Sequence, residues 1–204
     1  MYRIKLLTLS ASVFLLSACG GGGSSGGTTS PPPTPSTGIF LDSIVAGLHY
    51  QTATYSGTTN SAGEYDYLPG ETVTFSLGGI AFGSALAGPV VTPLSLVSGA
   101  TDATDPVVTN IVRLLLTLDD NADPSDGISI SSATAAAAVG QTVDFTATDL
   151  AADPGMVAVL RLLPGGPTLV DAASAQTHFA ATLAAQIHWG ALAWGAGTWQ
   201  GKTP

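Results

Sequence analysis

The sequence predicts an α+β protein, in which an antiparallel β-sandwich-like module and then a small helical subdomain follow a disordered tether. Between residues 39 and 95, apolar and polar residues alternate with a period of two, as in strands with one buried face. Between residues 96 and 190, apolar residues recur at helical spacing behind Asp-Pro pairs, which are favoured at helix starts. The composition, 45% hydrophobic and 9% charged, is unlike that of a disordered chain.

Changes of composition divide the chain into five predicted segments. They are a signal peptide at 1–18, a lipidated cysteine with a Gly/Ser/Pro tether at 19–38, the β module at 39–95, the helical subdomain at 96–190 and a Gly/Trp-rich tail at 191–204. About 165 residues follow the tether, which is enough for one sizeable core or for two small adjoining subdomains.

The residues before Cys19 have the three parts of a secretory leader. Arg3 and Lys5 supply positive charge, residues 6–16 form an apolar run, and two small residues precede Cys19. The run fits the apolar region of a signal peptide and is shorter than the ~20 apolar residues that span a bilayer. We therefore predict that the leader is removed.

The motif Leu16-Ser17-Ala18-Cys19 resembles the lipobox of bacterial lipoproteins, whose pattern is Leu-[Ala/Ser]-[Gly/Ala]-Cys. The resemblance implies cleavage before Cys19, a diacylglyceryl group on its sulfur and an acyl chain on its new amino terminus. Each buried methylene of such chains contributes ~0.8 kcal/mol, so two or three chains anchor a protein stably. Gly20 follows in place of an acidic residue, which by analogy with enteric bacteria favours the outer membrane. The alternative is an ordinary signal peptide and an incidental free thiol.

Residues 20–37 form a tether in two parts. The Gly/Ser-rich part is a flexible coil, and the Pro-rich part favours extended polyproline II. Together they would hold the body about 30–40 Å from the lipid. Because Cys19 is the only cysteine and is predicted to carry lipid, the body must be stabilised without disulfides.

The predicted mature chain is strongly acidic. Removal of Arg3 and Lys5 changes the formal net charge from −9 to −11. Phosphate binding requires clustered Lys and Arg, so we expect no nucleic-acid partner. An anionic membrane surface would also repel the body, and the expected membrane contact is through the acyl chains on Cys19.

The β module is predicted from alternating segments separated by turn residues. Pro69-Gly70 and Gly78-Gly79 stand between segments, as hairpin turns do. The residues predicted to face the core are Leu48, Tyr50, Tyr65, Tyr67, Val73, Phe75, Leu77, Ile80 and Phe82.

Two short motifs suggest a family for this module. The segment from Asn60 to Tyr65 resembles the [Asp/Asn]-x-x-Gly-x-[Phe/Tyr] turn and strand of transthyretin-like, carboxypeptidase-regulatory-like modules, and Val45-Ala46-Gly47-Leu48 is similar to their opening. The resemblance implies a β-sandwich of the kind found at the N-terminus of larger modular bacterial surface lipoproteins. Such modules serve as spacers, adhesive units and accessory domains, so the resemblance predicts fold rather than function.

Four helices are predicted after residue 96. Asp105-Pro106 begins the first, which has an apolar face. An Ala-rich helix covers 131–139, Asp153-Pro154 begins the third, and Asp171 caps a fourth at about 172–188. The residues that form the apolar face of the first are Val107, Ile111, Leu114, Leu115 and Leu118.

The acidic loop at 119–127 is a candidate calcium site. The candidate ligands are Asp119, Asn121, Asp123 and Asp126. The first three have the D-x-[DN]-x-[DN] spacing that supplies hard oxygens to calcium. However, Pro124 replaces the required glycine, and Ile130 stands where a bidentate glutamate belongs. The alternative is a turn that ends the preceding helix, with no cofactor bound.

The histidines and tryptophans give weaker signals. His178 and His188 are ten residues apart rather than at the i,i+4 spacing of helical metal ligands, and His49 lies in a predicted strand. Trp189, Trp194 and Trp199 recur every five residues. They form a glycan-stacking platform, a tail that docks its rings on the core, or an edge strand.

No serine lies in a recognisable nucleophile elbow, and no pair of acids has helical or strand support, so we expect no enzyme activity. The first functional hypothesis is a lipid-anchored bacterial envelope protein, with a non-catalytic body that binds or adheres to an envelope protein or glycan. The second is the non-catalytic N-terminal part of a larger secreted hydrolase or adhesin. The third is a small enzyme in its own right.

Overall fold

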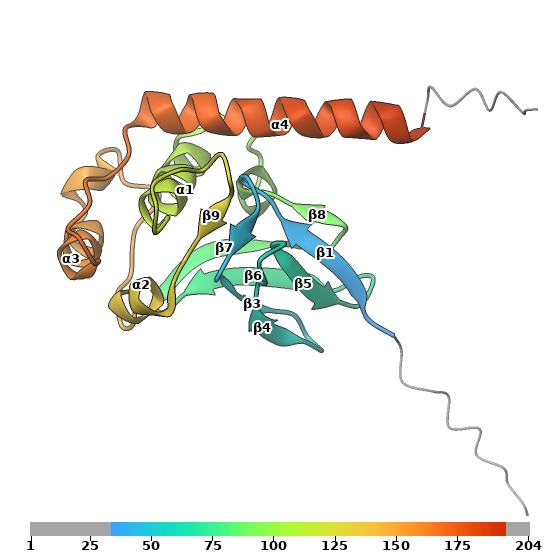
Figure 1. The fold of residues 1–204 in the computed structure, drawn as a ribbon, viewed down its shortest axis with the longest axis horizontal. Coiled ribbons are helices and arrows are strands. Elements are labelled where there is room, and N and C mark those ends of the chain that lie inside the picture. The colour runs from blue at the N-terminus through green and yellow to red at the C-terminus, as the bar shows by residue number, and fades with distance from the viewer. Residues whose placement is uncertain (1–33, 195–204) are drawn as a thin grey trace, which may run out of the picture. The chain divides into compact units, whose positions relative to one another are not determined.

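The computed structural model describes residues 34–194, and their side chains up to residue 186 (Figure 1). The predicted signal peptide, Cys19, most of the tether and residues 195–204 lie outside the described part. The described residues contain both β-sheets and helices, which confirms the α+β class. No helix among them is long and apolar enough to cross a membrane.

Eight of the strands precede the first helix, and β9 follows it. Their bounds are β1 Ser36–Phe40, β2 Val45–Ala46, β3 His49–Gln51, β4 Ser56–Thr58, β5 Glu64–Tyr67, β6 Thr72–Leu77, β7 Ile80–Leu86, β8 Val90–Val91 and β9 Ile128–Ser129. β1 begins within the last residues of the predicted tether. An antiparallel sheet has the order β4-β3-β6-β7, and a second has the order β5-β1-β8, with β8 parallel to β1.

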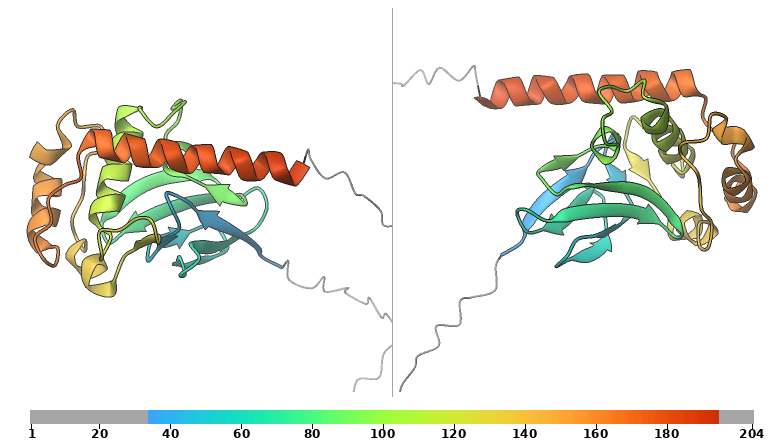
Figure 2. Two further views of the ribbon diagram at one scale, coloured as in Figure 1. Left: turned by 45° about the horizontal axis from the view of Figure 1, so that its top comes forward. Right: turned by 180° about the vertical axis from the view of Figure 1, so that it is seen from behind.

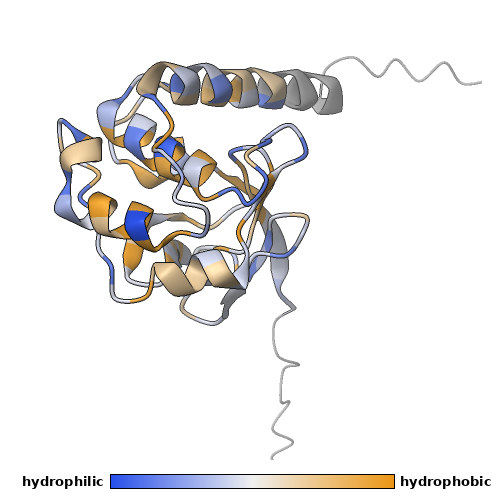
Figure 3. Ribbon diagram, turned by 60° about the vertical axis from the view of Figure 1, so that its left-hand side comes forward, coloured by the Kyte–Doolittle hydropathy of each residue, from blue (hydrophilic) through white to orange (hydrophobic). Residues whose placement is uncertain are grey.

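The short β2–β9 pair connects the two predicted segments. It is parallel and pairs Val45 with Ile128 and Ala46 with Ser129. β2 lies in the predicted β module and β9 in the predicted helical subdomain. Buried residues of both segments form one hydrophobic cluster, and apolar residues (orange in Figure 3) occur in strands and helices alike. The two segments therefore share a core.

Aromatic side chains join the two larger sheets. Phe75 of β6 is fully buried, with its ring centroid 4.4 Å from that of Phe40 on β1. The ring of Tyr65 on β5 is perpendicular to that of Phe75, with the two centroids 5.3 Å apart. The predicted alternation in β6 is confirmed, because Val73, Phe75 and Leu77 are buried and the residues between them are partly exposed.

The predicted turns lie where expected. The Asn60 side chain accepts hydrogen bonds from the backbone N–H groups of Ala62 and Glu64, which closes the turn before β5. Gly78, between β6 and β7, has φ +57°, and a Cβ there would lie 2.4 Å from the backbone of Ala138. Only glycine accommodates both the left-handed backbone and this close approach.

The α-helices are α1 Pro106–Thr117, α2 Ser132–Ala137, α3 Pro154–Leu162 and α4 Ala172–Trp194, and the short 3₁₀ turns are η1 Pro93–Leu96 and η2 Leu150–Ala152. The predicted caps are confirmed: Asp105, Asp153 and Asp171 each accept hydrogen bonds from backbone N–H groups of the first turn. α4 continues to Trp194, past the predicted end at 188.

α1 is the central helix of this part of the protein. Nine of its twelve residues are buried, so it contacts other elements on most sides. α4 packs against it along the first turns of α4, as both views of Figure 2 show.

Candidate functional site

A buried carboxylate lies in the turn that follows β1. Leu41 and Ile44 form an isolated β-bridge, and the two residues between them make a tight turn in which Ser43 has φ +53°. Asp42 is fully buried, and its Oδ1 lies 3.3 Å from Nε2 of His178 on α4. This distance suits an ion pair, but neither carboxylate oxygen has hydrogen-bond geometry to any described residue.

The electrostatics of the Asp42–His178 pair follow from this burial. Loss of solvent raises the pKa of the Asp42 carboxyl, and contact with His178 only partly opposes the effect. The pKa of His178 is also raised, chiefly by Asp42 and against the opposing effect of burial. Both shifts mean that the folded protein holds protons at this site more tightly than the unfolded chain does.

Ser43 completes a Ser-His-Asp group that lacks the geometry of a catalytic triad. Its Oγ lies 3.5 Å from the same Nε2 that Asp42 contacts. In a triad the serine and the aspartate occupy opposite ring nitrogens, so that the imidazole accepts the serine proton. Here the Ser43 hydroxyl instead donates to the carbonyl of Pro124 at 2.9 Å. The group therefore links the β1 turn, the acidic loop and α4.

The acidic loop uses its side chains to close turns. Asp119 is buried and accepts a hydrogen bond from the Ser129 N–H at 2.9 Å. Asp123 accepts from the N–H and hydroxyl of Ser125, and the Asn121 amide donates to Asp126 at 3.1 Å. The described residues contain no group of three or more His, Cys, Asp or Glu side chains that could hold a metal. Calcium binding by this loop stays a prediction.

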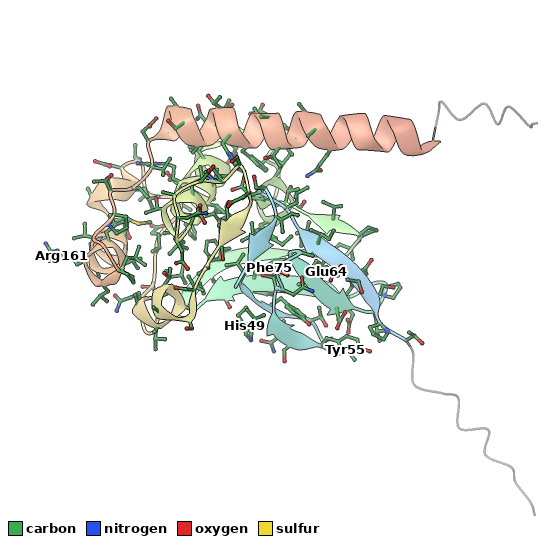
Figure 4. All side chains as sticks on the ribbon, viewed as in Figure 1. His49, Tyr55, Glu64, Phe75 and Arg161 are labelled. Carbon is green, nitrogen blue, oxygen red and sulfur yellow. The ribbon has the colours of Figure 1, made fainter. Side chains whose placement is uncertain are left out.

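Among the predicted aromatic and imidazole candidates, the structure describes the side chains of His49 and His178. His49 is exposed on β3, with its Nδ1 3.4 Å from the Ser76 hydroxyl (Figure 4). Trp189 and Trp194 belong to α4, but their side chains and that of His188 lie outside the described part, as does Trp199. Of the three histidines, His178 is the one placed against a charged partner within the described part of the chain.

A cavity of about 490 Å³ lies between the N-terminal turns of α1 and α4 and the segment 146–148. Its wall is polar and apolar in similar measure, and the polar side chains on it are Thr104, Thr109, Asn110, Arg113, Thr146, Thr148 and Gln176. The first residues of both helices, Pro106 and Ala172, also line it. Three of these residues belong to α1, where Arg113 is a helical neighbour of Thr109 at i,i+4 and of Asn110 at i,i+3.

Arg113 is held rigidly at the wall of this cavity. Its Nε donates to the carbonyl of Val170 at 2.8 Å, and its Nη1 donates to Oδ1 of Asn110 at 3.3 Å. The Asn110 amide in turn donates to the carbonyls of Phe145 and Ala147. Among the described residues, no carboxylate lies within ion-pair distance of Arg113. The ion pair found among them joins His178 to Asp42.

Comparisons with known proteins find no match. No protein-family model matches the chain, and neither a curated protein nor a solved structure does.

One feature of the sequence, a single charged residue in an apolar helix, could have indicated the cavity. Arg113 is the single charged residue in an otherwise uncharged helix, Pro106–Thr117, most of which is buried. A charged residue within a buried helix is rare unless it is paired or functional. By contrast, nothing local indicated that Asp42 and His178 would meet, because 135 residues separate them in the chain.

Proposed function

We propose that this protein is a lipid-anchored component of the bacterial cell envelope, held at the outer membrane through acyl chains on Cys19. The observation that carries the proposal is the position of the only cysteine, directly after Leu16-Ser17-Ala18 and an apolar leader. The strong negative charge of the remaining chain is compatible with this arrangement, because it favours a body that stays away from an anionic lipid surface.

The body is proposed to be a non-catalytic binding or adhesive module. Its two larger sheets would form a β-sandwich-like unit of the transthyretin-like, carboxypeptidase-regulatory-like kind. The contacts of Phe40 and Tyr65 with Phe75 support this, as does the turn built on Asn60. The non-catalytic assignment is supported by the arrangement at His178, where Ser43 and Asp42 approach one ring nitrogen.

The second candidate is the non-catalytic N-terminal part of a larger secreted hydrolase or adhesin. The resemblance of residues 45–48 and 60–65 to accessory modules of larger surface proteins favours it. Sequencing the reading frame beyond residue 204 tests this candidate. A continuing frame that encodes a catalytic or repeat domain would support it, and a stop codon would reject it.

Acylation is tested by replacing the lipobox cysteine. We expect Cys19→Ser to abolish labelling by a fatty-acid analogue and to leave the precursor uncut or the protein soluble. The matched control adds Ser24→Cys to this variant, which restores a thiol five residues beyond the processing site. The control should remain unlabelled, because lipidation depends on the motif and not on a thiol alone. Acyl chains on the Cys19→Ser protein would refute the anchoring proposal.

A further inference from the structure

A second, smaller cavity lies at the C-terminal end of α1. Its volume is about 200 Å³, and its wall is formed by the end of α1, the first residues of the acidic loop, Thr134 of α2 and the segment 163–167 after α3. These three helices lie on the same side of the sheets (Figure 1). The wall contains two aspartates, Asp119 and Asp120, and no lysine, arginine or histidine. Within the described part of the chain, neither aspartate belongs to an ion pair.

Asp119 has one carboxylate oxygen that the protein leaves without a partner. The residue is only 7% exposed, and its Oδ1 accepts the hydrogen bond from the Ser129 N–H. Its Oδ2 is buried and has no hydrogen-bond partner among the described residues. Burial of a charged oxygen without a partner is unfavourable. A ligand that donates a hydrogen bond to this oxygen would therefore be stabilised.

Two further negative groups meet at the same wall. Asp120 is exposed, and its Oδ1 accepts a hydrogen bond from the Thr134 hydroxyl at 2.8 Å, which restrains the carboxylate. The free carbonyl groups at the C-terminus of a helix carry partial negative charge, and the last turn of α1 has no basic residue to offset it. All three groups favour a positively charged ligand.

The rest of the wall selects among cations. It is more apolar than polar, with Leu118, Leu163, Pro164 and Pro167 beside the aspartates. A magnesium or calcium ion requires six or more oxygen ligands, and the described residues contain no group of three or more metal-binding side chains. An ammonium group on an alkyl chain suits both parts of the wall, because its head donates to carboxylates and its chain contacts apolar side chains.

The size of the cavity agrees with such a ligand. A volume of about 200 Å³ equals that of roughly six or seven water molecules at ~30 Å³ each. The four-carbon chain and ammonium group of a lysine side chain fit within this volume. A bulky or polycyclic amine would not.

We infer that this cavity binds a primary ammonium group on an unbranched alkyl chain, as carried by a lysine side chain of a partner protein. The ammonium group pairs with Asp119 and Asp120, and the chain contacts Leu118 and Leu163. The inference rests on the proposed binding function and deepens it by giving it a ligand chemistry. Loss of acylation at Cys19 would leave the cavity intact, and failure of ammonium binding would leave the anchoring proposal intact.

The test is an NMR titration of the full-length protein in a non-ionic detergent at constant ionic strength, with n-butylammonium chloride as probe. The probe should shift the backbone N–H signals of Asp119, Asp120 and Thr134 saturably, with millimolar affinity because so small a ligand makes few contacts. Methylammonium, which lacks the chain, and 1-butanol, which lacks the charge, should each bind roughly tenfold more weakly. Nα-acetyl-L-lysine methylamide should bind at least as well as the probe.

Two variants test the aspartates. Asp119→Asn keeps an acceptor for the Ser129 N–H and should weaken binding of the probe roughly tenfold or more. Asp120→Asn changes an exposed residue, so it serves even where Asp119→Asn does not fold, and it should weaken binding roughly two- to fivefold. The matched control is Asp144→Asn, which is also exposed and also accepts from a threonine hydroxyl, that of Thr146. It should bind as the wild type does.

A second measurement on the wild-type protein locates the ligand. The methylene protons of the probe should show nuclear Overhauser effects to the methyl groups of Leu118 and Leu163, and none to those of the exposed Leu86. The inference is overturned if no saturable binding occurs up to roughly 50 mM probe, which covers very weak affinities. Equal binding of 1-butanol or methylammonium, or an equal loss of affinity in Asp144→Asn, would also overturn it. Binding of magnesium in place of the probe would assign a metal site instead, and binding of n-butylammonium but not of the lysine derivative would exclude a protein lysine as the ligand.

Discussion

The two larger sheets are joined by a different kind of contact from the one that attaches α4. Between the sheets the contacts are aromatic and fully buried, with Phe75 at their centre. α4 also buries apolar groups, Ala175 and Phe179, but polar contacts accompany them. His178 contacts Asp42, and Gln176 donates to the Thr109 hydroxyl at 3.1 Å.

The difference indicates which conditions each region should respond to. Burial of apolar surface is not directional and does not depend on protonation. A buried carboxylate beside an imidazole is stabilised only while the pair holds its proton. The sheets are therefore expected to set the overall stability of the body, and the attachment of α4 to make that stability depend on pH.

The largest expected effect is removal of the central aromatic ring. Phe75→Ala should lower the free energy of unfolding by ~3–5 kcal/mol, because it deletes contacts with Phe40 and Tyr65 and leaves a cavity. Chemical denaturation followed by circular dichroism measures the loss. The same change should leave the pH dependence of stability as it is in the wild type, since no titrating group is removed.

The control is the neighbouring residue in β6. Thr74 points away from the core and shares a 2.7 Å hydrogen bond between its hydroxyl and that of Ser84 at an exposed site. Thr74→Ala should therefore cost under about 1 kcal/mol. Equal losses for Phe75→Ala and Thr74→Ala would mean that the assignment of the two faces of β6 is wrong.

The second prediction concerns α4. Because the folded-state pKa values of Asp42 and His178 are both raised, their contribution to stability decreases as pH rises. The histidine contribution is fully present below its ordinary pKa of 6.5 and is lost as pH passes through the raised value. Melting temperatures between roughly pH 6 and 9 should therefore fall in the wild type and change less in His178→Gln.

Two comparisons sharpen this measurement. His49→Gln removes an exposed histidine on β3 and should keep the wild-type pH dependence (Figure 4). Exposed aspartates whose pKa is lowered by hydrogen bonds, such as Asp144 and Asp171, give the opposite slope, with stability lost as pH falls through their pKa values in acid. A pH slope that survives in His178→Gln and disappears in His49→Gln would refute the assignment.

Local pattern predicted the local features of this fold and missed the distant pairings. A period of two predicted the buried face of β6, and Asp105 before Pro106 predicted the start of α1, because both depend on neighbours in the chain. The β2–β9 pairing and the Asp42–His178 contact join residues far apart, which no local period specifies.

The acidic loop illustrates a second limit of sequence reasoning. The spacing of Asp119, Asn121 and Asp123 resembles that of calcium ligands, but the same residue types are also favoured for turn formation. Sequence spacing does not distinguish oxygens that point outward to an ion from oxygens that accept hydrogen bonds from nearby backbone N–H groups. In the structure, Asp119 accepts from Ser129 and Asp123 from Ser125.

The smallest expected effect is that of calcium on the acidic loop at 119–127. This loop contacts the turn after β1 through the hydrogen bond from the Ser43 hydroxyl to the carbonyl of Pro124. A bound ion must displace the Asn121–Asp126 bond and would lack a bidentate glutamate, so we expect millimolar affinity. At a concentration equal to such a dissociation constant, calcium would add only about 0.4 kcal/mol. Thermal melting with calcium, with magnesium and with chelator measures this shift. Asp126→Asn should remove it, whereas Asp149→Asn, outside the loop, should keep it. Identical melting in all three buffers up to several millimolar calcium, on the order of the weakest known protein sites, would mean that these side chains serve turn formation alone.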